Sequence, residues 1–89
     1  MEKEIEVNGK KFVVRELLNS EIKKLPTILE IDSPEVKTQK NEEIIKQETI
    51  LASGITEEEY NKLTRKEFLT IRMAILKLNT PDQDFWATN

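Results

Sequence analysis

The apolar residues of this chain change their spacing near Leu18, from every second position to every third or fourth position. The first spacing is typical of a strand with one buried face, and the second is typical of an amphipathic helix. A chain with this change combines a sheet element at its N-terminus with helices after it. We therefore predict an α+β fold in which an N-terminal β-hairpin packs on a small bundle of three to four helices.

The dipeptide Asn8-Gly9 predicts the turn of the hairpin, because a type I′ turn needs positive φ at both central residues. A two-residue loop at this place pairs Val7 with Lys10 and Ile5 with Phe12. This register puts the apolar residues of both strands on one face, namely Ile5, Val7, Phe12 and Val14. Two strands alone are marginally stable, so this face must pack on helices or bind strands from another chain.

The segment after Leu18 has helical spacing that a proline interrupts. Ile22, Leu25 and Leu29 share one helical face, and Asn19 or Ser20 can cap its start. Pro26 lacks the N–H that a helix interior needs. We therefore expect two short helical pieces or one kinked helix, followed by a new start with Ser33 as the N-cap and Pro34 at the first helical position.

Residues 34–43 contain a single apolar side chain, Val36. A stretch of this kind cannot bury a face, so it is either a solvated helix end or a mobile loop. A surface loop is the simpler interpretation, and a segment that becomes ordered on a partner is the alternative. The second interpretation makes Val36 a candidate partner-binding residue.

Two capping boxes follow each other in the second half of the chain. We expect a helix over residues 44–53, with Ile44, Ile45, Leu51 and Ala52 as its apolar stripe. Gly54 then supplies a left-handed stop. The motifs Thr56-Glu57-Glu58-Glu59 and Thr64-Arg65-Lys66-Glu67 each predict a helix start in which the first and last residues satisfy backbone N–H groups. A short helix over residues 57–63 and a longer one from Arg65 are the consequence.

The last helix has a wide apolar pattern. Phe68, Ile71, Ile75 and Leu78 share one face, and we expect Leu69, Met73 and Leu76 to widen that stripe. The basic residues of this helix are expected on a solvated face; these are Arg65, Lys66, Arg72 and Lys77. Thr80-Pro81 ends the helix, because proline disfavours helical backbone at the residue before it.

The domain prediction is one hairpin-plus-helix domain over residues 1–80 and a flexible tail over residues 81–89. The tail contains adjacent aromatic residues, Phe85 and Trp86. They are either the last plug of the core or an anchor for another protein, since aromatic residues dominate binding hot spots. Phe85 and Trp86 join Val36 as the candidate partner-binding residues.

Composition argues against several classes of function. The chain has no cysteine and no histidine, which removes thiolate nucleophiles, zinc-thiolate sites and the commonest general base. A net charge of −3 argues against a nucleic-acid binder. No apolar run approaches the length of a membrane span, and the N-terminus does not resemble a secretory signal. We expect no enzymatic activity, no catalytic residue, no metal and no cofactor.

The stretch from Ala52 to Phe68, ASGITEEEYNKLTRKEF, resembles the tail assembly chaperones of long-tailed bacteriophages and related viruses. Members of that family share the order of helix, glycine, capped short helix, second cap and closing helix. The segment Val14-Arg15-Glu16-Leu17, between hairpin and first helix, is also similar. Glu67 stands where the family more often has aspartate, which is a conservative difference for a cap.

The resemblance implies a non-enzymatic chaperone that binds the tape-measure protein and keeps it soluble during assembly of the tail tube, with tail tube subunits as a further partner. It implies a location in the host cytoplasm and absence from the mature virion. The alternative from the residues is a small acidic viral inhibitor or regulator of a host protein. We also expect self-association, because a free hairpin edge can pair with another copy.

Overall fold

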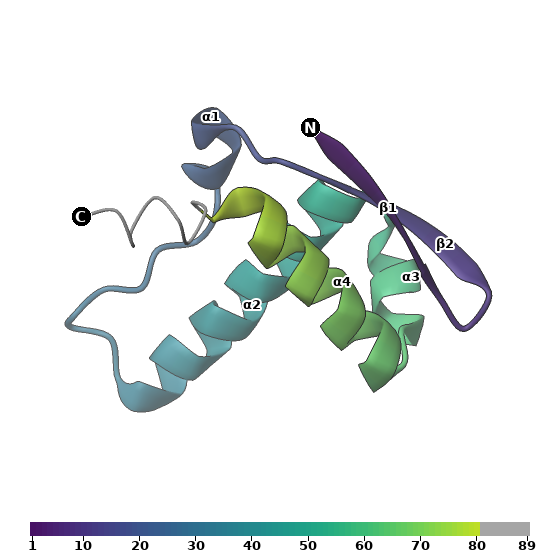
Figure 1. The fold of residues 1–89 in the computed structure, drawn as a ribbon. Helices are drawn as coiled ribbons and strands as arrows, with labels where there is room; N and C mark the ends of the chain where they lie inside the picture. The colour runs from purple at the N-terminus through teal and green to yellow at the C-terminus, as the bar shows by residue number, and fades with distance from the viewer. Residues whose placement is uncertain (81–89) are drawn as a thin grey trace, which may run out of the picture.

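The computed structural model describes residues 1–80, and it begins with the hairpin that the sequence predicts (Figure 1). Strands β1 (Glu2–Val7) and β2 (Lys10–Arg15) are antiparallel, and Val7 lies opposite Lys10. Asn8 and Gly9 have φ of 53° and 79°, as a type I′ turn requires. The predicted register and the predicted inner face are both confirmed, with Val7 and Val14 buried and Ile5 and Phe12 partly buried.

The segment after the hairpin is less helical than its spacing predicts. Helix α1 (Asn19–Ile22) is one turn long, and the chain from Lys23 to Ser33 forms turns and irregular backbone. The expected second helical piece around Pro26 is therefore absent here, in keeping with the missing proline N–H. The expected cap at Asn19 or Ser20 is also wrong: Leu18 is the N-cap, and its N–H donates to the Glu21 carboxylate at 3.0 Å.

Helix α2 (Pro34–Ser53) is twenty residues long and contains the segment that we interpreted as a surface loop. That interpretation is wrong, and the solvated helix end is the correct one. Ser33 is the N-cap, with its Oγ accepting from the Val36 N–H at 3.3 Å, and Pro34 occupies the first position as predicted. Once this start is formed and the second half is packed, each further helical residue costs little. Gly54 ends the helix with φ of 70°.

Both predicted capping boxes are present and fix the corner between the last two helices. Helix α3 (Glu57–Lys62) begins after Thr56, whose hydroxyl accepts from the Glu59 N–H. Helix α4 (Arg65–Asn79) begins after Thr64, which exchanges the same pair of bonds with Glu67. The last helix ends at Asn79, and its C-cap is Thr80, the residue before Pro81 in the sequence.

Helix α4 is the centre of the fold, because it contacts β1, β2 and α2 (Figure 1). The buried cluster comes from the hairpin, α2 and α4, and its members are Val14, Ala52, Ile71, Ala74 and Ile75. The predicted α+β fold, a hairpin on a small group of helices, is confirmed. Within residues 1–80, no helix combines the length and the apolar character that crossing a bilayer would require.

Candidate protein-binding surface

Helix α4 carries a second apolar face that does not belong to the core. Leu69, Met73 and Leu76 have exposed fractions of 45%, 59% and 48%. A helix turns by about 100° per residue, so their spacing places them together on the side opposite Ile71 and Ile75. Our expectation that they widen the core stripe is wrong. We call this exposed stripe of Leu69, Met73 and Leu76 the α4 outer surface.

Apolar residues on both sides of a helix are typical of a helix that is covered all round. Single exposed apolar side chains are ordinary, whereas a contiguous group of them marks a contact site. The rotation of about 100° per residue would have distinguished the two faces of α4 on the basis of sequence alone. The α4 outer surface is the candidate binding feature that our sequence reasoning missed.

A groove of about 200 Å³ runs beside the α4 outer surface, between α4 and β1. Met73 belongs to both features. The groove is lined from the strand by two residues and from the helix by four, namely Lys3, Ile5, Thr70, Met73, Ala74 and Lys77. Ile5 and Ala74 make its lining partly apolar, and lysines stand on both sides of it.

The lysines near the groove are available for a partner. Lys3, Lys66 and Lys77 are exposed, and none of them makes an ion pair with another residue of the described range 1–80. Lys66 lies four residues before Thr70 and therefore on the same side of α4. An apolar stripe with a basic border fits an amphipathic segment that has acidic residues along one side.

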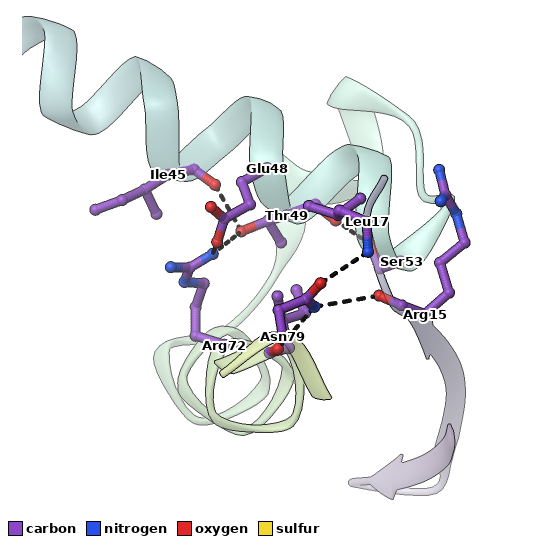
Figure 2. Close-up of polar contacts among 9 residues, drawn as sticks. Arg15, Leu17, Ile45, Glu48, Thr49, Ser53, Arg72 and Asn79 are labelled. Carbon is purple, nitrogen blue, oxygen red and sulfur yellow. Dashed lines mark hydrogen bonds and ion pairs between the residues drawn. The ribbon is translucent and has the colours of Figure 1, made fainter. Parts of the chain in front are cut away.

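Arg72 departs from the solvated basic face that we expected. Its side chain is 16% exposed and donates to Glu48 Oε1 of α2 at 2.6 Å, as Figure 2 shows. It also lies 3.4 Å from Thr49 Oγ1, and the Thr49 hydroxyl donates to the Ile45 carbonyl at 2.7 Å. Thr49 is fully buried. These contacts hold α4 against α2, so the outer surface lies on a fixed helix.

Asn79 joins the end of α4 to the chain that leaves the hairpin (Figure 2). Its Oδ1 accepts from the Leu17 N–H at 2.7 Å, and its Nδ2 donates to the carbonyls of Ile75 and Arg15 at 2.9 and 3.4 Å. Leu18, the next residue along, is 67% exposed. Asn79 therefore fixes the end of α4 to the segment that leads from the hairpin to α1.

Glu67 anchors the start of α4 and is almost fully buried, at 1% exposed. Its Oε1 accepts from the Thr64 N–H at 2.8 Å, and Nζ of Lys10, the first residue of β2, lies 3.2 Å from Oε2 as an ion pair. The hydrogen bond from Thr64 is the main cause that lowers the pKa of this carboxyl, and Lys10 acts in the same direction. Glu67 therefore links the hairpin to α4 as a charged group.

Of the partner-binding residues predicted from the sequence, the structure describes Val36, which lies on α2 and not with the α4 outer surface. Val36 is 36% exposed and lies in the first turn of α2, the end of that helix that is away from the hairpin (Figure 1). Phe85 and Trp86 lie outside the described residues. Within residues 1–80, no group of three or more His, Cys, Asp or Glu side chains could hold a metal ion.

Comparison with protein-family models, with curated proteins and with solved structures finds no significant match for this chain.

Proposed function

We propose that this chain is a non-enzymatic tail assembly chaperone whose α4 outer surface binds an apolar helical segment of the tape-measure protein. The observation that carries the proposal is the pair of apolar faces on α4, one in the core and one exposed. A chaperone needs a surface of this kind, because it must cover apolar side chains of its client until the client is assembled. The sequence resemblance around the two capping boxes supplies the identity of the client.

The α4 outer surface favours a helical client. Leu69, Met73 and Leu76 form a ridge along the helix, and side-chain ridges of one helix pack into the grooves of another. The exposed Lys66 and Lys77 beside the ridge favour a client helix with acidic residues at its border. Binding is expected in the host cytoplasm, and release before tail completion would leave the chain absent from purified virions.

Co-expression with the tape-measure protein of the same virus tests the proposal. The wild-type chain should raise the soluble fraction of that client, and the variant Leu69→Gln with Met73→Gln should lose this effect while keeping its melting temperature. Val13→Gln is the matched control, because Val13 is 45% exposed on the hairpin, like Leu69 on α4. A client that stays insoluble with the wild-type chain would contradict the chaperone function.

The same assay separates the α4 outer surface from the residues that the sequence singled out. Val36→Gln, and Phe85→Ala with Trp86→Ala, are tested as separate variants. Loss of client solubility in these variants, with full activity of the α4 variant, would move the binding site away from α4 and leave the chaperone function in place. A host enzyme inhibited by the purified chain would instead support the inhibitor alternative.

A further inference from the structure

One edge of the hairpin has backbone groups that no other residue of the described range 1–80 pairs with. Val7 and Lys10 flank the two-residue turn as a hydrogen-bonded pair, and such pairs alternate along an antiparallel ladder. Every second pair counted from Val7–Lys10 is therefore hydrogen-bonded, and the last of this series is Met1 with Glu16. The Glu16 N–H indeed donates to the Met1 carbonyl at 3.1 Å. The N–H and C=O groups of Glu2, Glu4 and Glu6 therefore point away from β2. We call these outward groups the β1 edge.

Within residues 1–80 the β1 edge has no hydrogen-bond partner, whereas the corresponding edge of β2 is partly occupied. No hydrogen bond between residues of the described chain uses the backbone groups of Glu2, Glu4 or Glu6 in the outward direction. On β2, the Arg15 carbonyl accepts from Asn79 Nδ2 at 3.4 Å, and the strand contacts α2. A free strand edge is a template for a further strand.

The two faces beside the β1 edge differ in chemistry. The side chains of Glu2, Glu4 and Glu6 are all exposed and lie on the outer face of the hairpin. On the inner face, Lys3 and Ile5 line the groove that β1 shares with α4. An added strand would place alternate side chains beside the acidic row and over the groove.

We propose that the β1 edge binds an extended partner segment, with alternating basic and apolar residues, as a third strand. Basic side chains of the segment lie beside Glu2, Glu4 and Glu6, and its apolar side chains enter the groove lined by Ile5, Met73 and Ala74. Backbone hydrogen bonds supply affinity, and the alternating side chains supply specificity. The inference stands independently of the helical client, although Met73 lines both sites.

Charge disfavours a second copy of the chain at this edge. Antiparallel pairing of β1 with β1 centred on Glu4 would set Glu4 against Glu4 and Glu2 against Glu6, and like charges directly opposite each other are destabilising. Within the hairpin, Lys11 Nζ lies 3.9 Å from Glu4 Oε1, and both side chains are exposed, so this ion pair is weak. The acidic row therefore remains available to a basic partner.

Amide hydrogen exchange with a short blocked peptide of alternating lysine and valine tests the proposal. In the free chain, the amides of Ile5 and Val7 are expected to be protected by β2, and those of Glu4 and Glu6 to exchange freely. Binding should protect the amides of Glu4 and Glu6 and should weaken as salt is added. A peptide of alternating glutamate and valine should not bind.

Glu4→Pro gives the sharpest variant, because the Glu4 N–H points away from β2 and proline is tolerated on the solvent side of an edge strand. This variant should keep the fold and bind the lysine peptide about tenfold more weakly or worse. Val13→Pro is the matched control, because the Val13 N–H points away from β1, out of the opposite edge of the hairpin. This variant should bind the lysine peptide as the wild type does. If Glu4→Pro is unstable, an N-methylated lysine peptide tests the backbone pairing instead, because it cannot donate the hydrogen bonds that a third strand needs.

Three results would overturn the proposal. These are equal binding by the N-methylated peptide, binding without protection of the Glu4 and Glu6 amides, and no binding of the lysine peptide. Protection of those amides that rises with protein concentration in the absence of peptide would assign the edge to a second copy and would also overturn it.

Discussion

The guanidinium of Arg72 donates to Glu48 Oε1 at 2.6 Å and so joins α4 to α2 across 24 positions of the chain. The two side chains are 16% and 25% exposed, so the ion pair is shielded from water more than the pairs at the surface. Removing Arg72 alone leaves the carboxylate of Glu48 without its partner in a partly buried place.

We expect Arg72→Met to lower the free energy of unfolding by about 1–2 kcal/mol. A double-mutant cycle with Glu48→Gln should give a coupling energy of about 1 kcal/mol in urea denaturation. Lys62→Met serves as the control, because its ion pair with Glu58 is 74% and 78% exposed, and its loss should cost at most about 0.5 kcal/mol. A coupling energy indistinguishable from zero would show that packing, and not this ion pair, holds α4 on α2.

Asn79 should contribute to stability through the three hydrogen bonds of its side chain. Asn79→Ala removes the acceptor of the Leu17 N–H and the donor to Ile75 and Arg15. We expect a loss of about 1 kcal/mol and faster exchange of the Leu17 amide in particular. Asn61→Ala on α3 is the control for the higher helix propensity of alanine. Unchanged exchange at Leu17 in Asn79→Ala would mean that the bond to Asn79 does not persist in solution.

The features that the sequence predicted correctly are those that neighbouring residues determine. Asn8-Gly9 specifies a turn, and the turn then fixes the whole register of the hairpin. Ser33, Gly54 and the box of Thr64 with Glu67 act through hydrogen bonds or backbone angles within a few residues. Such signals do not depend on where the rest of the chain lies, so they can be read without a structure.

The features that the sequence did not predict depend on contacts between distant elements. Arg72 resembles any other basic residue of a helix until Glu48 and Thr49 of α2 are placed beside it. The exposed start of α2 has no apolar pattern that would predict a helix. It is helical because of its local cap at Ser33 and the packing of the second half of the same helix. The α4 outer surface is different, since Leu69 and Met73 could have been separated from the core face by their angular position alone.

Gly54 is expected to be necessary for the end of α2. Its φ is 70°, and a Cβ built there has no heavy atom within 4 Å, so a substitution would suffer backbone strain without steric overlap. Gly54→Val should therefore cost about 1–2 kcal/mol, and Gly54→Asn should cost less, because asparagine enters the left-handed region more readily. Urea denaturation measures both. Equal stability of the valine variant and the wild type would contradict the left-handed stop.

Glu21 predicts a dependence of stability on pH. Its two carboxylate oxygens accept from the Arg15 guanidinium at 2.9 and 2.6 Å, and one also accepts from the Leu18 N–H at 3.0 Å. These bonds lower the pKa of Glu21 from 4.5 to about 2. The hydrogen bonds from Arg15 are the largest cause, and the hydrogen bond from Leu18 is the next. The folded chain therefore binds the proton of Glu21 less readily than the unfolded chain does.

A carboxyl whose pKa is lower in the folded chain stabilises the fold when it is ionised. This stabilisation is fully present at a pH above the pKa of the unfolded chain and is lost as the pH falls through the pKa of the folded chain. The contribution of Glu21 should be complete above about pH 5.5 and disappear progressively down to about pH 2. An NMR titration of the Glu21 carboxyl should give a pKa near 2, and the stability difference between wild type and Glu21→Gln should shrink over the same range. A titration midpoint near 4.5 would show that the ion pair with Arg15 does not form in solution.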